Sequence, residues 1–258
     1  MFSMRRILLF VLIGTAVLGC KQSLLQKSPG FQLQEGDLLF QDLDRGPLSD
    51  AIEKVTTGFQ GMNLSHVGIV AKDDAGKFVV IEAVSAGVEA TPFETFLGRS
   101  LDGKRRPKVV VGRLKKPYRH LVPSALKEAF SLKGKPYDKA FVIENDAYYC
   151  SELIYEILLR ANNGNPVFTL QPMTFKAPDT GETLAVWEEY FSKLGVSIPE
   201  GEPGINPGGL SRSPALTIIQ PYGNVSRSSL SQRRRYLSLN WHRAFRNSKG
   251  RKWEPKTL

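Results

Sequence analysis

Two strongly apolar segments on either side of a turn constrain the fold of this chain more than any other feature. Residues 65–70 read Ser-His-Val-Gly-Ile-Val, and residues 78–83 read Phe-Val-Val-Ile-Glu-Ala. Residues 73–76 between them, Asp-Asp-Ala-Gly, carry a turn signal. Apolar runs of this length that flank a turn predict two β-strands joined as an antiparallel hairpin.

Strand and helix signals along the rest of the chain complete the pattern. Helical spacing, with Pro near helix starts and Gly after helix ends, predicts several helices. Together the elements predict an α+β fold in which an antiparallel sheet packs against helices. Residues 201–213, rich in Gly, Pro and Ser, are predicted to form a long loop. The further predicted strands lie at 36–40, 87–90 and 108–113, and the predicted helices at 48–55, 93–97, 123–132, 150–161 and 186–194.

The N-terminus has the parts of an export signal. Residues 1–6 hold two arginines, and the apolar run 7–18 is too short for a comfortable transmembrane helix. Residues 17–20, Val-Leu-Gly-Cys, resemble the bacterial lipobox, in which the cysteine is lipidated and becomes the first mature residue. We expect residues 1–19 to be a lipoprotein signal peptide and Cys20 to anchor the protein in a membrane of the bacterial cell envelope. An ordinary signal peptide cleaved elsewhere is the alternative.

The lipid on Cys20 would leave the second cysteine, Cys150, without a disulfide partner, since the chain has only two cysteines. Cys150 opens the predicted helix 150–161, where the positive end of the helix dipole favours a thiolate. Burial as a small apolar side chain is the alternative. The mixed setting, with two tyrosines before Cys150 and Ser-Glu after it, favours a reactive thiol.

The register of the hairpin decides which side chains meet. If Val70 lies opposite Phe78, then His66 lies opposite Glu82 on the same face of the sheet. A shift by one residue would turn Glu82 to the other face. In the first case Glu82 would accept the proton of one His66 ring nitrogen while the other nitrogen meets the thiol. A histidine satisfied by backbone or water is the alternative, but His66 alone among three histidines lies inside a predicted strand.

The hairpin and the cysteine helix together resemble the YiiX-type permuted papain-like hydrolases, relatives of the NlpC-type cell-wall peptidases and of lecithin retinol acyltransferase. The residues that carry the resemblance are Ser-His-Val-Gly-Ile-Val, Val-Ile-Glu-Ala at 80–83, and Tyr-Tyr-Cys-Ser-Glu-Leu-Ile-Tyr at 148–155. In these proteins the histidine strand precedes the cysteine helix, the reverse of papain. The resemblance implies a circularly permuted papain-like (NlpC-type) fold with the nucleophile at a helix N-terminus.

The resemblance also implies roles for individual residues. Cys150 would be the nucleophile, His66 the general base and Glu82 the third catalytic residue, which orients His66, a place where many relatives have histidine. The implied chemistry is acyl transfer through a thioester. The backbone N–H of Cys150 is the natural oxyanion donor at a helix start. A hydroxyl of Tyr149 or Tyr137 is a candidate second donor, with aromatic packing as the alternative for each.

The mature chain is expected to consist of three parts, the last of which is distinguished by its positive charge. Residues 20–30 are expected to be a tether, residues 31–224 the hydrolase domain, and residues 225–258 a basic segment with ten Lys or Arg against one acid. For a lipoprotein, this segment fits anionic lipid headgroups or wall polymers better than nucleic acid, and a merely solvated end is the alternative. We expect no metal and no cofactor, because Cys, His and carboxylates show no ligand spacing.

The sequence thus predicts a cysteine hydrolase that cleaves an amide bond in a small peptide or an acylated amino compound at the cell envelope. A lipid esterase, thioesterase or acyltransferase is one alternative. A non-catalytic envelope binding lipoprotein that has kept the fold is the other.

Overall fold

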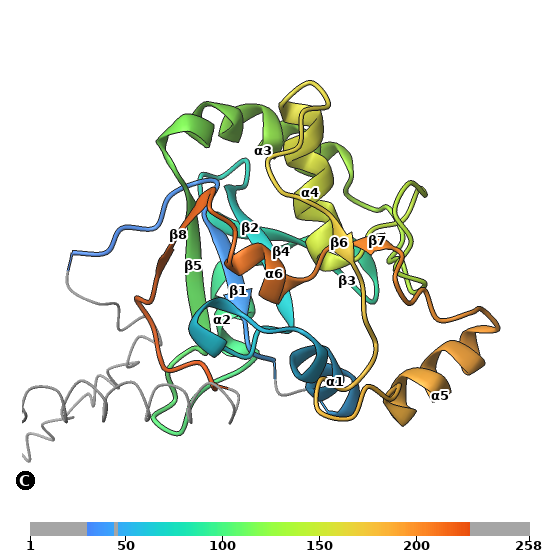
Figure 1. Cartoon of the computed structure of the whole chain (residues 1–258). Helices are drawn as coiled ribbons and strands as arrows, with labels where there is room; N and C mark the ends of the chain where they lie inside the picture. The colour runs from blue at the N-terminus through green and yellow to red at the C-terminus, as the bar shows by residue number, and fades with distance from the viewer. Residues whose placement is uncertain (1–29, 44–45, 228–258) are drawn as a thin grey trace, which may run out of the picture.

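A six-stranded antiparallel sheet runs through the centre of the structure (Figure 1). The computed structural model describes residues 30–43 and 46–227, so that the signal peptide, Cys20 and residues 228–258 lie outside the described residues. The strand order is β4-β3-β2-β1-β5-β8, and each neighbouring pair is antiparallel, as an α+β fold with an antiparallel sheet requires. The strands are β1 (Leu38–Gln41), β2 (His66–Lys72), β3 (Phe78–Val84), β4 (Gly87–Pro92), β5 (Val109–Leu114) and β8 (Leu216–Ile219).

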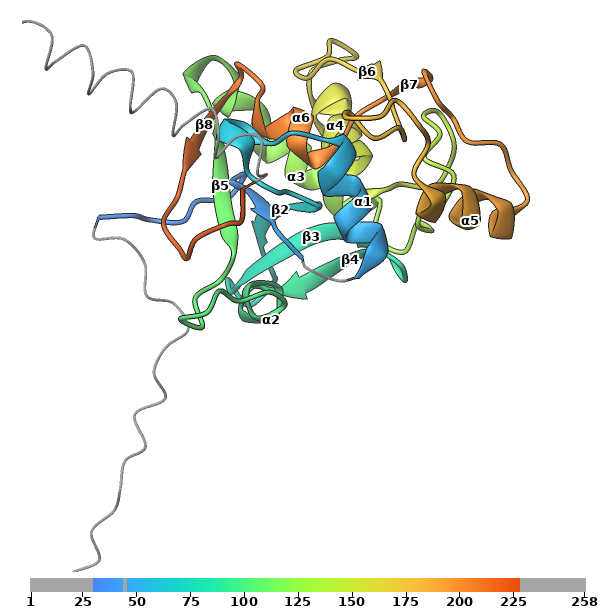
Figure 2. The same ribbon diagram turned by 60° about the horizontal axis from the view of Figure 1, so that its bottom comes forward.

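The two faces of the sheet are covered by different helices, which Figure 2 shows on opposite sides. Neighbouring residues of a strand point to opposite faces. Ile69 of β2 accordingly belongs to a buried cluster with Ile154 of helix α4, whereas Val70 belongs to another with Phe96 of helix α2. Burial of both faces explains why the strands read as continuous apolar runs. The two helices span Cys150–Ala161 (α4) and Phe93–Gly98 (α2).

An aromatic cluster holds helices α1 and α5 together beside the sheet. Trp187 and Phe191 of α5 are buried with Phe175 and with Ala51 of α1. The rings of Trp187 and Phe191 lie 5.1 and 5.3 Å from the ring of Phe175 and are nearly perpendicular to it, which is a geometry that aromatic pairs prefer. The remaining elements are α1 (Pro47–Val55), α3 (Val122–Ser131), α5 (Ala185–Leu194), α6 (Pro207–Ser211), two 3₁₀ helices (Phe59–Gly61 and Lys116–Leu121) and the paired β6 (Gln171–Pro172) and β7 (Pro203–Gly204).

The hairpin forms as predicted, but its register differs from the expected one by two residues. Val70 pairs with Val80, and Lys72, not Val70, pairs with Phe78. His66 and Glu82 are therefore diagonal neighbours instead of direct partners. Because the side-chain period of a strand is two, a shift of two residues keeps both side chains on one face.

The C-terminal part of the described chain is more ordered than the sequence indicates. Residues 201–213, predicted as a loop, contain β7 and α6, and β8 was not predicted. Val225 is buried in the main core, the Ser226 N–H donates to the Asp42 carboxylate, and the Asn63 N–H donates to the Ser226 carbonyl. The first residues of the predicted basic segment, 225–227, therefore pack against the body of the protein.

Candidate active site

Cys150 is the first residue of α4, and its position there follows from how this helix starts. The Glu152 carboxyl accepts the Tyr149 N–H at 3.1 Å, which ties the first turn back to the residue before the helix. Leu153 and Ile154, both fully buried, fix the helix on the sheet. The N–H of Cys150 has no acceptor within a helix that begins there, so it is available as a donor to a ligand. Burial raises the pKa of Glu152 to about 8, which reduces negative charge near the thiol at neutral pH.

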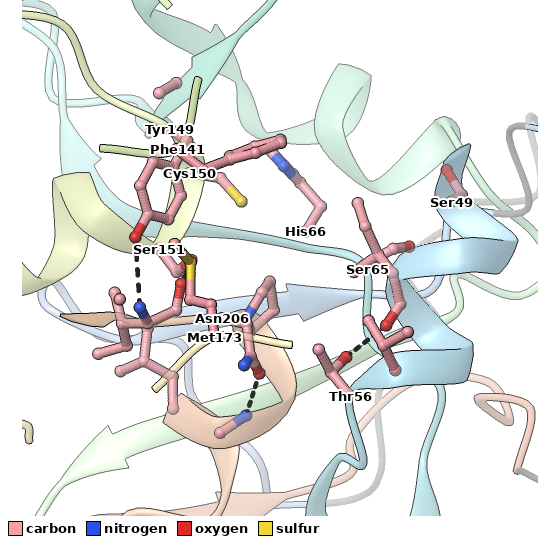
Figure 3. Close-up of a pocket in the computed structure, with 18 of the residues that line it drawn as sticks. Ser49, Thr56, Ser65, His66, Phe141, Tyr149, Cys150, Ser151, Met173 and Asn206 are labelled. Atoms are coloured by element: carbon pink, nitrogen blue, oxygen red, sulfur yellow. Dashed lines mark hydrogen bonds between the residues drawn. The ribbon is translucent and has the colours of Figure 1, made fainter. Parts of the chain in front are cut away.

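His66 begins β2 and lies opposite Gln41 of β1. Its Nε2 lies 2.5 Å from Oε2 of Glu82, and the Cys150 side chain lies close enough to raise the pKa of the His66 ring. Figure 3 shows the Cys150 sulfur directed toward the His66 ring. Since Glu82 takes Nε2, the nitrogen left for the thiol is Nδ1. The structure thus brings together the three residues that the sequence singled out.

Glu82 is fully buried in β3 and has three partners. Besides His66, the Thr91 hydroxyl donates to Oε1 at 2.5 Å and the Arg99 guanidinium donates to Oε2 at 2.6 Å. The diagonal contact with His66 depends on Gly68 between them. A Cβ at Gly68 would lie 3.1 Å from the Glu82 Cβ, so the missing side chain leaves the carboxylate room to reach across.

The pKa values of His66 and Glu82 move in opposite directions. Burial alone would lower the pKa of His66, but the hydrogen bonds to Cys150 and Glu82, with their negative charges, outweigh it and raise the pKa from 6.5 to about 9. Burial alone would raise the pKa of Glu82, but His66, with hydrogen bonds from Arg99 and Thr91, lowers it from 4.5 to about 2. At neutral pH an imidazolium beside a carboxylate is favoured, and such a cation stabilises a thiolate at Cys150.

The two tyrosines proposed as oxyanion donors differ in position. The Tyr149 hydroxyl accepts the Ile205 N–H at 3.2 Å, and Figure 3 shows it pointing away from the Cys150 sulfur. Tyr149 therefore ties α4 to the segment before α6, which favours the packing alternative. Tyr137 is half-buried on the wall of the same cavity as Cys150. Burial, followed by the nearby negative charge of Cys150, raises the pKa of Tyr137 well above its ordinary value, so its hydroxyl keeps its proton and can donate.

Cys150 and His66 lie on the wall of a cavity of about 1440 Å³. This volume exceeds the roughly 300–1,000 Å³ of an ordinary small-molecule site. The walls that α1, α5 and α6 contribute are mainly apolar, whereas Ser65, Glu89 and Arg99 add polar groups. The apolar contributors from these helices are Leu48, Ile52, Val55, Trp187, Leu194 and Leu210.

Arg99 and Thr91 were not anticipated from the sequence. A buried glutamate needs hydrogen-bond donors or a cation, but the chain has 35 Lys and Arg residues and nothing in their spacing marks Arg99. The one usable signal was the short strand after the turn at Gly87, because a third strand beside β3 must place some of its side chains next to Glu82.

The described residues contain neither a metal-binding group of side chains nor a membrane-spanning helix. Within residues 30–43 and 46–227, no three His, Cys, Asp or Glu side chains are grouped so as to hold a metal ion. Among the helices of the same residues, none is long and apolar enough to cross a membrane.

Comparison with known proteins places this geometry in a family. Residues 32–220 match the family described as permuted papain-like amidase enzymes, YaeF/YiiX, C92 family. The uncharacterized protein YiiX of Escherichia coli K12 is 29% identical over 199 residues, which cover 76% of this chain and 92% of that protein. The crystal structure of a protein described as the metalloprotein yiiX, from Escherichia coli O157:H7, has 28% identity and a TM-score of 0.60, and the match covers 74% of this chain and 98% of that one. The chain therefore belongs to the permuted papain-like amidases of the YaeF/YiiX type, a family of cysteine hydrolases.

Proposed function

We propose that this protein hydrolyses an amide bond in a small peptide or an acylated amino compound, with Cys150 as nucleophile and His66 as general acid and base. The observation that carries the proposal is the chain of contacts from Cys150 through His66 to Glu82 on the cavity wall. A nucleophile, a base within hydrogen-bond reach and a third group that orients the base are the parts that covalent catalysis requires.

The first half of the reaction would form a thioester. The Cys150 sulfur attacks the amide carbonyl carbon, and the negative charge that develops on oxygen lies near the N–H of Cys150. The C–N bond then breaks as His66 Nδ1 gives its proton to the leaving nitrogen, so that an amine departs and the acyl group stays on sulfur.

The second half would release the acyl group. Water attacks the thioester carbon while His66, now neutral, takes one of its protons at Nδ1. The C–S bond breaks, a carboxylic acid leaves, and the sulfur is again a thiolate beside an imidazolium. Glu82 stays ionised throughout and keeps the second ring proton on Nε2, which holds the tautomer that both halves need.

An acyl-chain substrate is the second candidate, and the apolar walls of the cavity favour it. Leu48 and Ile52 of α1 face the same space as Leu194 of α5 and Leu210 of α6. A cavity of about 1440 Å³ with such walls has room for a fatty acyl group as well as a short peptide. The esterase, thioesterase and acyltransferase alternatives share the thioester step, so the acyl part and the leaving group distinguish them.

The description of yiiX from Escherichia coli O157:H7 as a metalloprotein does not lead us to a metal-dependent step for this chain. The residues present do not fit such a site, because among the described residues no three His, Cys, Asp or Glu side chains are grouped so as to hold a metal ion. The strongest single candidate ligand, Glu82, already has its oxygens occupied by His66, Arg99 and Thr91.

The cell envelope is the proposed location, and it rests on residues 1–20 of the sequence. A lipid on Cys20 would hold the domain at a membrane facing the periplasm or the exterior, within reach of wall peptides and acylated compounds.

The proposed function is tested with acyl p-nitroanilides and p-nitrophenyl esters, whose acyl groups range from alanyl to dodecanoyl. We expect cleavage by the native protein, no cleavage by Cys150→Ala, and a mass increase equal to the acyl group on the Cys150 peptide during turnover. A preference for alanyl anilides would support the peptide amidase and a preference for dodecanoyl compounds the acyl-chain candidate. Equal rates for native protein and Cys150→Ala would overturn both.

A further inference from the structure

Arg99 and His66 share one oxygen of the buried Glu82 carboxylate. The Arg99 NH1 donates to Oε2 at 2.6 Å, and Nε2 of His66 lies 2.5 Å from the same atom. The second Arg99 nitrogen, NH2, donates to the Thr91 hydroxyl at 3.3 Å, and that hydroxyl itself donates to Oε1. The side chain of Arg99 is 15% exposed and that of Glu82 is 0% exposed, so these charges interact with little screening by water.

We propose that Arg99 is a positioning residue for the proposed hydrolysis: it fixes the Glu82 carboxylate and limits how strongly that carboxylate stabilises the His66 imidazolium. The inference rests on the proposed function, since it concerns the proton that His66 gives to the leaving amine. A buried carboxylate without a second cation would stabilise the protonated form of His66 so strongly that His66 would be a weak general acid. A cation that shares the same carboxylate oxygen reduces this stabilisation.

Charge balance in the buried site supports this role. The groups that face Glu82 are His66 from β2, Thr91 from β4 and Arg99 from the end of α2, while Cys150 of α4 lies beyond His66. With Arg99 present, Glu82 and Arg99 form a neutral pair whether the Cys150 and His66 pair is ionised or neutral. Without Arg99, one uncompensated negative charge would remain buried in either state, which is costly.

One more carboxylate lies near this network. Glu89 of β4 comes within 3.5 Å of the Thr91 hydroxyl and is exposed to the cavity. Its charge is screened by water there, so it does not replace the pairing between Arg99 and Glu82.

The position of Arg99 is itself fixed by its neighbours. Its guanidinium lies 5.5 Å from the centre of the Phe96 ring, within the range of a cation–π contact. The Phe96 carbonyl accepts the side-chain amide of Gln41, the β1 residue that lies opposite His66. The helix that carries Arg99 is thus bonded to the strand next to His66, which keeps the guanidinium in one place.

The test compares Arg99→Met, which removes the charge at similar length, with Arg99→Lys, which keeps a charge but loses the planar fork. The His66 ring is titrated by NMR, with its signal assigned from its absence in His66→Gln. We expect the His66 pKa to rise by about one unit in Arg99→Met and to stay near the native value in Arg99→Lys. Identical titrations of the native protein and Arg99→Met, or equal shifts in both variants, would overturn the inference.

Hydrolysis adds a readout that a purely structural role would not change. A p-nitroanilide needs a proton on its leaving nitrogen more than a p-nitrophenyl ester needs one on its oxygen. Arg99→Met should therefore lower kcat for the anilide several-fold more than kcat for the ester with the same acyl group, with KM little changed, and Arg99→Lys should recover part of the difference. Equal losses for the two compounds would contradict the inference.

A variant that keeps Arg99 protects the test against misfolding. Thr91→Val removes the donor to Oε1 at constant volume and should shift the His66 pKa in the same direction by less. If Arg99→Met does not fold, as judged by circular dichroism, an unshifted His66 pKa in Thr91→Val overturns the inference. Absence of any Cys150-dependent cleavage would instead overturn the proposed function, and the titration of His66 would still decide whether Arg99 controls its charge.

Discussion

Glu82 reaches His66 diagonally across the β2–β3 ladder, with 2.5 Å between Oε2 and Nε2. The diagonal contact exists because residue 68, which lies between the two side chains, is glycine. The orientation of the proposed base therefore depends on a residue that takes no part in the chemistry, as well as on the donors that hold Glu82 from the other side.

Replacement of Glu82 by Gln tests the orienting role at nearly constant shape. The amide cannot stabilise an imidazolium and no longer selects the productive tautomer, so we predict a loss of kcat of about 10²-fold or more. The His66 pKa should fall from about 9 toward its ordinary 6.5, measured by NMR titration. Unchanged kcat with a shifted pKa would show that the charge of Glu82 is dispensable.

The pH dependence of the free energy of unfolding should reflect the pKa shifts of Glu82 and His66. The Glu82 pKa falls from 4.5 to about 2, so its contribution to the free energy of unfolding is complete above 4.5 and disappears as the pH drops through about 2. The His66 pKa rises from 6.5 to about 9, so its contribution is complete below 6.5 and disappears as the pH rises through about 9. Both contributions are present between pH 4.5 and 6.5.

Urea denaturation at a series of pH values measures this effect. The difference in free energy of unfolding between the native protein and the double variant His66→Gln, Glu82→Gln should be largest between pH 4.5 and 6.5. It should shrink toward pH 9 and above. A difference that grows with pH would contradict the assigned direction of the His66 shift.

Gly68→Ala should disturb the site without removing any functional group. The added Cβ would come within 2.5 Å of a Val80 methyl carbon and 3.1 Å of the Glu82 Cβ. Overpacking of this kind destabilises by about 1–3 kcal/mol, and here it also pushes Glu82 away from His66. We predict lower stability in urea together with a lower kcat and a lower His66 pKa.

Gly112→Ala is the matched control, because its Cβ would meet the Phe40 ring at 2.6 Å in the β1–β5 part of the sheet. It should lower stability to a similar extent and leave kcat unchanged under conditions where the protein is folded. Equal effects of the two variants on kcat would mean that Gly68 acts through stability alone.

Most of the element pattern and the three central residues could be predicted from sequence because they depend on local signals. Continuous apolar runs, the turn at 73–76 and the start of the helix at Cys150 are readable without tertiary information. The parity of the register was enough to place His66 and Glu82 on one face, although the predicted partner of Val70 was wrong by two residues. The turn sequence alone does not show how many residues between the two strands remain unpaired, and that number sets the register.

The partners of Glu82 could not be predicted because they are fixed by packing. Thr91 reaches Glu82 through the pairing of β3 with β4, and Arg99 is held beside Glu82 by the cation–π contact of its guanidinium with Phe96. Likewise, α6 begins with Pro207 in a Gly-rich segment, and Asn206, whose side chain accepts the Gly209 N–H, caps it. Composition made this segment look like a loop, while the cap and the contacts with α4 make it a short helix.

Membrane anchoring is predicted to depend on Cys20. Cys20→Ser should release the protein into the soluble fraction or leave the signal peptide uncleaved, as shown by fractionation and by the mass of the product. Full retention on membranes in high salt would remove the main support for a lipoprotein.

The basic residues after Arg227 are predicted to bind anionic surfaces. Residues 228–258 hold nine Lys or Arg against one acid, and each basic residue near an anionic membrane contributes about 1 kcal/mol, weakened by salt. Because 225–227 pack on the domain, the truncation is made after Arg227. The unlipidated truncated protein should keep its hydrolytic activity and lose salt-sensitive binding to phosphatidylglycerol vesicles. Loss of folding or activity on truncation would make these residues part of the domain.

The reactivity of Cys150 tests the central claim most directly, because it needs no substrate. The rate of alkylation by iodoacetamide is measured from about pH 5 to 9 in the native protein and in His66→Ala, with the modified cysteine identified by peptide mass. An imidazolium beside the thiol and the start of α4 both favour thiolate, so we predict faster alkylation of the native protein at about pH 6 than of an unperturbed thiol, and a clear slowing in His66→Ala. Equal rates at that pH in the two proteins would contradict the pairing of Cys150 with His66 on which the proposed hydrolysis depends.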